Sequence, residues 1–245
     1  MLELNTIHKT DCLIGMQDLP DKSVDMVLSD LPYGILDCKW DKPLDLTLFW
    51  GQINRIIKDN GAIVLTATMK FAIDLINSNK RYFRYDLNWS KTMSVGHANC
   101  NRMPMRSHEL ILLFYKKLPT YNPQGLIPTK NQKIQHKYSS DREHTYKTES
   151  LSNPYTKRFT NYPRSVLTFQ NNNSKNVHPT QKPLDMFKYL IQTYSNPGDL
   201  ILDTCMGSGT TAIAALETER CFVGFETDER YFELATKRVA AWKSG

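Results

Sequence analysis

The stretch that decides the fold is LILDTCMGSGTTA, residues 200–212, which is followed by CFVGFE at residues 221–226. Its pattern predicts a buried strand over 200–203, a turn with Gly207 and Gly209, and a helix over 210–216. Glycines at such a turn let the backbone approach a ligand, and GSGTTA fits the loose dinucleotide pattern G-x-G-x-x-A. Glu226 ends the next predicted strand, where a carboxylate can accept hydrogen bonds from ribose hydroxyls. We therefore predict an adenosine-containing cofactor; the alternative is a tight strand-to-helix turn, which gives Glu226 no purpose.

Strand and helix patterns alternate along most of the chain. Apolar or alternating runs predict strands, and apolar spacing of three to four residues predicts helices. Asn60-Gly61 is expected to form a turn before its strand. Together these patterns predict a doubly wound α/β sheet that is interrupted once. The expected strands are 24–28, 62–66, 82–89, 109–115, 200–203 and 221–225, and the expected helices are 44–58, 71–77, 183–194, 210–216 and a last one through 231–242.

The interruption lies at residues 116–177, between the two halves 1–115 and 178–245. It contains eleven Lys and Arg against three Asp and Glu, so it carries more than the whole net charge of +6. Prolines and polar residues leave it without a sustained helical or strand period, and seven Tyr and Phe lie among the basic residues. Cations with interleaved aromatics bind phosphates and stack on bases, although a solvated loop at one edge of the domain is an equal alternative.

The composition excludes several classes of protein. With 40% hydrophobic and 23% charged residues, the chain is neither disordered nor fibrous. The longest apolar run, 110–115, is far shorter than a membrane span, so we expect a cytoplasmic protein that makes no membrane contact. Five scattered cysteines lack a CxxC pair, and HELIL at 108–112 lacks the second histidine of a zinc site. We expect reduced thiols, an ordinary strand at 109–115 and no metal.

The loop SDLPYG, residues 29–34, follows the first predicted strand and has an unusual composition for a connection. Pro32 disfavours helix at Leu31 and keeps it extended, so the Leu31 carbonyl can lie beside the Asp30 carboxylate. Two acceptors at one point can hold an exocyclic amino group of a nucleobase, and the ring of Tyr33 offers a stacking face. The alternative is a simple turn with Tyr33 in the core.

Four motifs then occur in a known order: DLPYG at 30–34, HPTQKP at 178–183, LDTCMGSGTT at 202–211 and GFETDERY at 224–231. In these motifs, over nearly its whole length, the chain resembles the S-adenosylmethionine-dependent amino-methyltransferases of DNA. It is most similar to the permuted (beta) group, in which the catalytic loop precedes the cofactor loop and a target-recognition region separates them. The resemblance implies a seven-stranded, mostly parallel Rossmann-like sheet with one antiparallel strand, for which 109–115 is the candidate.

The resemblance also assigns roles to residues. Asp30 and the Leu31 carbonyl would accept hydrogen bonds from the target amine, and Tyr33 would stack on the base. Pro32, the remaining residue of this catalytic loop, would keep Leu31 extended. The residues implied at the S-adenosylmethionine site are Asp11 at the adenine, Glu226 at the ribose, Asp203 at the methionine end, Gly207 and Gly209 at the close approach, and Thr180 and Lys182 over the methionine moiety. Two departures stand out: Leu31 replaces a commoner proline, and Cys205 replaces a frequent phenylalanine.

These assignments predict a site-specific methyltransferase that modifies N6 of an adenine flipped out of double-stranded DNA. The Asp that opens the catalytic loop resembles the adenine branch more than the Ser or Thr of the cytosine-N4 branch. Restriction-modification would make a homodimer and an accompanying endonuclease candidate partners. The alternatives are an N4-cytosine enzyme, a methyltransferase of RNA or of a protein amide, a nucleotide-dependent oxidoreductase, and a DNA-binding protein without catalysis.

Overall fold

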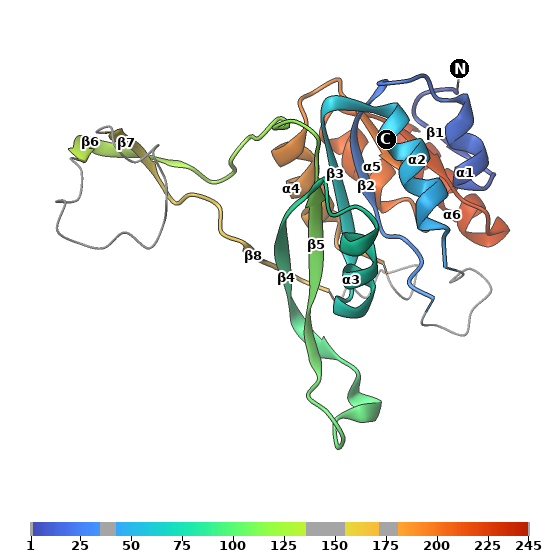
Figure 1. The fold of residues 1–245 in the computed structure, drawn as a ribbon, viewed down its shortest axis with the longest axis horizontal. Coiled ribbons are helices and arrows are strands. Elements are labelled where there is room, and N and C mark those ends of the chain that lie inside the picture. Colours follow the sequence, from blue (N-terminus) through green and yellow to red (C-terminus); the bar gives the residue numbers. More distant parts are fainter. Residues whose placement is uncertain (1, 35–42, 136–154, 172–180, 245) are drawn as a thin grey trace. The chain divides into compact units, whose positions relative to one another are not determined.

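The computed structural model describes residues 2–34, 43–135, 155–171 and 181–244 of the chain. The chain folds into two compact units (Figure 1). The main unit joins residues 1–122 to residues 165–245, and the second unit spans residues 123–164. The predicted insert 116–177 is therefore longer than the second unit, because residues 116–122 and 165–177 belong to the main unit.

The main unit is built on a sheet of eight strands among the described residues, in the order β1-β10-β9-β2-β3-β5-β4-β8. Only β5 runs antiparallel to its neighbours, which confirms the predicted antiparallel strand. The count of seven strands was too low by one, because the four-residue β8 pairs with β4 at the sheet edge. The strands are β1 (Thr6–His8), β2 (Val24–Ser29), β3 (Ile57–Ala67), β4 (Phe83–Val95), β5 (Arg106–Phe114), β8 (Val166–Phe169), β9 (Leu200–Asp203) and β10 (Cys221–Phe225).

Helices cover both faces of this sheet, as a doubly wound fold requires. Buried residues of α4, α5 and α6 form one apolar core with one face of β2, β3 and β9. Buried residues of α1, α2 and α3 form the other core against the opposite face. The helices are α1 (Cys12–Gly15), α2 (Leu46–Ile56), α3 (Met69–Ser78), α4 (Leu184–Tyr194), α5 (Thr210–Glu217) and α6 (Glu229–Ser244), with short 3-10 turns η1 (Met16–Asp18) and η2 (His97–Asn99).

Local chemistry explains most of these boundaries. Asp45 caps α2 by accepting hydrogen bonds from the backbone N–H groups of Thr47 and Leu48. The predicted turn at Asn60-Gly61 was wrong, because both residues lie within β3. A Cβ on Gly61 would lie 2.8 Å from the Asp25 carbonyl oxygen, where β2 and β3 slip in register, so this glycine serves close strand packing.

The second unit contains an antiparallel hairpin of β6 (Ile127–Gln135) and β7 (Tyr155–Thr160). The sequence showed no strand period there, because the strands form a two-stranded ribbon with a register shift between Pro128 and Lys133. None of the helices in the described ranges has the length and apolar character needed to cross a bilayer.

Candidate active site

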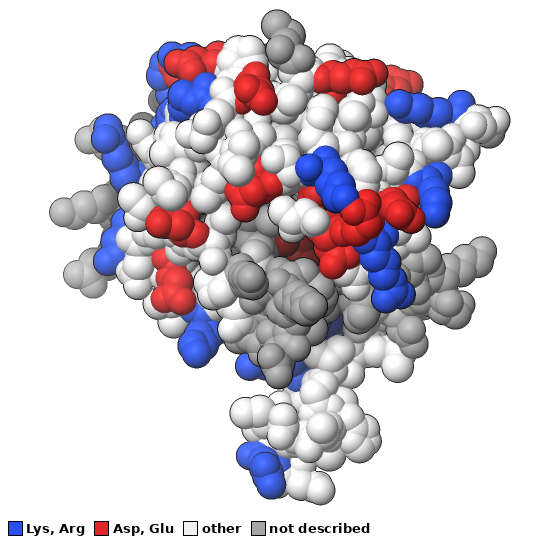
Figure 2. All heavy atoms as spheres, turned by 90° about the vertical axis from the view of Figure 1, so that its right-hand side faces the viewer, with Lys and Arg blue, Asp and Glu red and all other residues white. Residues whose placement is uncertain are grey.

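A cavity of about 570 Å³ lies at the carboxyl ends of β1, β2, β9 and β10. β9 and β2 are neighbours in the sheet although their connections run in opposite directions, so this is the switch point at which α/β sheets bind ligands. Figure 2 shows a hollow on the face that carries α1, α2 and α6, with acidic side chains at its rim. The carboxyl ends of four strands thus supply loops to one cavity.

The two glycines of the loop after β9 do different things. Gly207 lines the cavity with φ at +52°, and a Cβ there would meet no atom within 4 Å. Gly209 caps α5 with φ at +81°, and its Cβ would lie 3.0 Å from that of Ala235 on α6. Gly207 therefore leaves space for a ligand, whereas Gly209 allows α5 and α6 to pack closely. Gly209 is not part of the described cavity wall.

Three carboxylates that follow or end different strands line the same cavity as the glycine loop. Glu226 accepts hydrogen bonds from the backbone N–H groups of Gly207 (2.7 Å) and Asp228 (2.8 Å), and burial raises its pKa. Asp203 is buried and accepts from the Ser29 hydroxyl at 2.9 Å, and burial raises its pKa to about 6. Asp11 caps α1 through a 2.7 Å bond from the Leu13 N–H and also lines the cavity.

The catalytic-loop candidates line the same cavity. Asp30 follows β2 directly, and its Oδ1 accepts hydrogen bonds from the Tyr33 hydroxyl at 2.6 Å and from the Thr66 hydroxyl. The Leu31 side chain is buried, and Pro32 lies between it and Tyr33 in the cavity wall. The Tyr33 ring packs against Phe71 with the centroids 5.1 Å apart, and burial, with the charge of Asp30, raises its pKa.

A network of four alternating charges surrounds the Asp30 carboxylate. Lys182 is buried, and its Nζ lies 2.5 Å from Asp30 Oδ2 and 3.5 Å from Glu109 Oε2. Lys91 donates to Glu109 Oε1 at 2.5 Å. Burial lowers the pKa of Lys182, but the charges of Asp30 and Glu109 outweigh this and raise it, so the ammonium form is favoured.

The network limits what Asp30 can still accept. A carboxylate has about four acceptor positions, and the hydroxyls of Tyr33 and Thr66 take two on Oδ1. Lys182 takes one on Oδ2. Asp30 therefore retains capacity for about one further donor, which is what one N–H of an amino group requires.

Sequence reasoning missed part of this arrangement. Glu109 lies in β5, as the strand prediction required, but its carboxylate is mostly shielded from solvent and pairs with Lys91 and Lys182. Lys182 was assigned to the cofactor; it lines the cavity and forms ion pairs with Asp30 and Glu109, which the sequence did not indicate. Thr180 falls outside the described residues. Cys205 contacts Cys12 in the cavity wall, and this contact together with burial raises the pKa of its thiol.

No group of His, Cys, Asp and Glu in the described ranges is arranged to hold a metal ion. The cavity has free space beside Gly207 and hydrogen-bond acceptors at Glu226 and Asp30. Both features fit a transfer between two organic ligands.

Comparison with known proteins gives a consistent picture. A family model described as DNA methylase matches residues 24–237. The chain is 30% identical to type II methyltransferase M1.MboII from Moraxella bovis, with 96% of each protein covered. It is 28% identical to DNA adenine methyltransferase YhdJ from Escherichia coli strain K12, covering 97% of this chain and 83% of YhdJ.

Solved structures share the fold as well. The M1.HpyAVI–SAM complex matches with a TM-score of 0.64 and 25% identity, covering 95% of this chain and 98% of that one. The cytosine-N4-specific PvuII DNA methyltransferase matches with a TM-score of 0.69 over 95% of this chain and 85% of that one. At 16% identity, the second match speaks for the fold alone.

Proposed function

This chain belongs to the DNA methylase family, and we propose that it transfers a methyl group from S-adenosylmethionine to N6 of adenine in double-stranded DNA. One observation carries the proposal: the Asp30 loop and the glycine loop, 173 residues apart between Asp30 and Asp203, line a single cavity. An amino group held at one loop would lie beside a nucleoside held at the other.

The residues present fit the cofactor. The space in front of Gly207 admits a ligand where any side chain would intrude, and the buried Glu226 can accept from ribose hydroxyls. Asp203 supplies a buried carboxylate for a cationic group such as the methionine ammonium. When bound, S-adenosylmethionine supplies an electrophilic methyl group on its sulfonium.

The protein's part in the reaction is to hold and polarise the target amine. An exocyclic amine is a poor nucleophile because its lone pair is delocalised into the ring. Hydrogen bonds from its two N–H groups to Asp30 and the Leu31 carbonyl favour a pyramidal nitrogen and stabilise the positive charge that develops on alkylation. Lys182 holds the Asp30 carboxylate through an ion pair at Oδ2. After the transfer, the methylated nitrogen releases its extra proton to water. Tyr33 would contact the base face.

Adenine is favoured over cytosine by the aspartate that opens the catalytic loop and by the name of the relative YhdJ, a DNA adenine methyltransferase. We assign sequence recognition to residues 116–177, whose charge suits DNA phosphates. A homodimer and an accompanying restriction endonuclease stay predictions from the resemblance, and light scattering would check the homodimer.

The test is transfer from labelled S-adenosylmethionine to unmethylated genomic DNA, followed by mass spectrometry of the nucleosides. Asp30→Ala is compared with Asp86→Ala, an exposed aspartate on β4 away from the cavity. We expect N6-methyladenine with the wild type and Asp86→Ala and none with Asp30→Ala. N4-methylcytosine as the sole product would overturn the choice of adenine. Absence of any methylated base, with the cofactor bound, would overturn DNA as the substrate.

A further inference from the structure

Strands β4 and β5 continue beyond the rest of the sheet. The pairing of β4 with β8 ends at Lys91, and the pairing of β5 with β3 ends at Leu110 (Figure 1). Among the described residues, strand pairing between Thr92 and Ser107 involves only these two strands. We call residues 92–107 the hairpin arm. A two-stranded hairpin is only marginally stable in water, so a partner surface would stabilise it.

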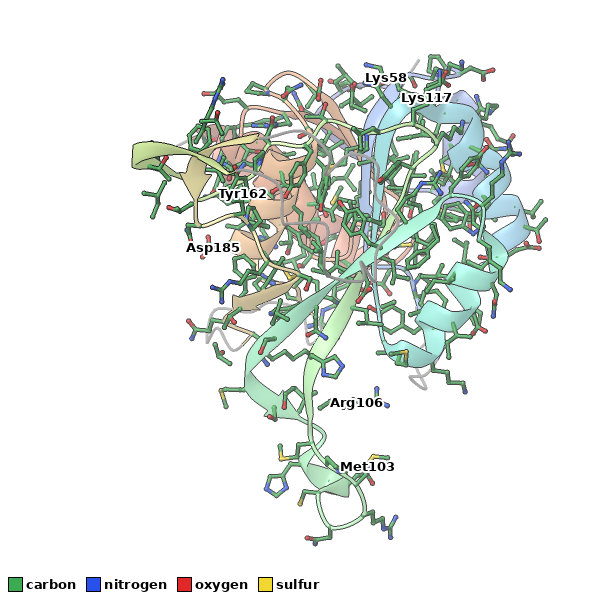
Figure 3. All side chains as sticks on the ribbon, turned by 60° about the vertical axis from the view of Figure 1, so that its left-hand side comes forward. Lys58, Met103, Arg106, Lys117, Tyr162 and Asp185 are labelled. Atoms are coloured by element: carbon green, nitrogen blue, oxygen red, sulfur yellow. The ribbon has the colours of Figure 1, made fainter. Side chains whose placement is uncertain are left out.

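The hairpin arm combines exposed apolar side chains with arginines and polar residues, and it carries no acidic side chain. Met93 and Met103 are each more than half exposed, and Val95 and Met105 are exposed as well. Arg102 and Arg106 are exposed, and the sequence has no Asp or Glu from 92 to 107. Figure 3 shows Met103 near the tip and Arg106 at the start of β5. On the face in Figure 2, the arm projects at the bottom with basic and no acidic side chains.

The root of the hairpin arm is also a wall of the catalytic cavity. Lys91, Val95 and Asn171 all line that cavity. Asn171 holds the arm through both of its amide atoms: Oδ1 accepts from the Met93 N–H at 2.9 Å, and Nδ2 donates to the Met93 carbonyl at 2.8 Å. The strands slip in register between Ser90 and Val95, where the arm leaves the sheet. Displacement of the arm would therefore reach the cavity wall.

The chemistry of the arm favours one partner. A flipped base leaves an apolar gap between its stacked neighbours, and flexible apolar side chains can enter such a gap while nearby arginines bind phosphates. A second copy of the chain is a poorer partner. If the arms of two copies met, Arg102 and Arg106 would find no acidic side chain on the opposite arm to pair with. We propose that the hairpin arm grips duplex DNA beside the target base, with Met103 and Met105 against the unstacked bases and Arg102 and Arg106 on phosphates. This inference rests on the proposed function.

Two paired variants test the arm. In the arginine variant, Arg102→Ala with Arg106→Ala, loss of two phosphate contacts lowers the slope of log affinity against log salt by about 1.8. In the methionine variant, Met103→Ser with Met105→Ser, that slope is kept. Methyl transfer to unmethylated genomic DNA falls roughly tenfold or more, because the apolar contacts that both methionines would make with the unstacked bases are lost. Both variants bind S-adenosylmethionine as the wild type does.

The controls are Arg81→Ala, an exposed arginine before β4, and Leu48→Ser, an exposed apolar residue on α2. Both should match the wild type in salt dependence and transfer. All variants are first checked for folding by urea unfolding and for oligomeric state by light scattering.

The outcomes separate the two proposals. If the wild type methylates DNA and both arm variants behave like the controls, the arm proposal is wrong while the proposed function stands. If the wild type methylates no DNA, the proposed function fails and the arm proposal with it. If the arm variants convert a dimer to a monomer and leave the salt slope unchanged, the arm contacts a second copy and not DNA.

Discussion

Gly207 and Gly209 belong to one motif, yet alanine at Gly207 should mainly weaken ligand binding and alanine at Gly209 should mainly lower stability. Both have positive φ, so alanine costs each about 1–2 kcal/mol of backbone strain. At Gly207 the new methyl meets no protein atom within 4 Å and occupies cavity space. At Gly209 it would lie 3.0 Å from the Cβ and 3.2 Å from the Cα of Ala235, which adds about 1–3 kcal/mol of overpacking. Gly209→Ala should thus lose about 2–5 kcal/mol of unfolding free energy.

Urea unfolding of the apo protein and calorimetric titration with S-adenosylmethionine measure the two effects separately. Gly207→Ala should weaken cofactor binding roughly tenfold or more, because the methyl displaces ligand contacts, and should lose only the strain energy in stability. Gly209→Ala should unfold at lower urea and bind the cofactor normally wherever it remains folded. The reasoning is refuted if Gly209→Ala weakens the cofactor as strongly as Gly207→Ala at unchanged stability.

Two further predictions concern buried charges. Lys182→Met leaves Asp30 and Glu109 without their shared cation, so it should cost about 3 kcal/mol of unfolding free energy and stop methyl transfer. Lys188→Met breaks a more exposed ion pair on helix α4, which follows Lys182, and should cost under ~1 kcal/mol. Equal costs would contradict the network. Burial raises the pKa of Asp203 to about 6, so its contribution to stability falls as pH rises from about 4 to about 6 and is level above. A cationic group of the cofactor binds only the ionised form of Asp203, so cofactor affinity measured by calorimetry should rise up to about tenfold per pH unit towards pH 6. If the wild type shows the same flat pH profile as Asp203→Asn, Asp203 does not bind that cation.

Buried elements could be predicted from the sequence, and short or edge elements could not. The bounds of β9 and β10 agree residue for residue with the predicted strands, because their apolar runs are bounded by turn residues. β1 and β8 have three and four residues with few buried side chains, which is too short for a recognisable period. At Asn60-Gly61 the composition of a turn was overridden by strand pairing across a register shift.

Candidate site residues could be predicted where a short motif by itself indicated a chemical role. Asp30 and Tyr33 were identified from one loop, Gly207 from a second and Glu226 from the end of a strand, and all four line one cavity. Lys182 was recognised only through a motif, and its contact with Asp30 spans 152 positions of sequence. No local pattern shows such a pair, because its geometry depends on how α4 and β2 pack in the completed sheet.

Glu109 shows why the missing part matters for the reaction. A buried lysine beside Asp30 would, by itself, oppose the positive charge that develops on the target nitrogen. Glu109 offsets this, since Oε2 lies 3.5 Å from the Lys182 ammonium and Oε1 binds Lys91. The formal charges of the two lysines and two carboxylates sum to zero, so no net positive charge surrounds the Asp30 acceptor. The electrostatics of the proposed amine site therefore depend on a strand residue, Glu109, that neither loop contains.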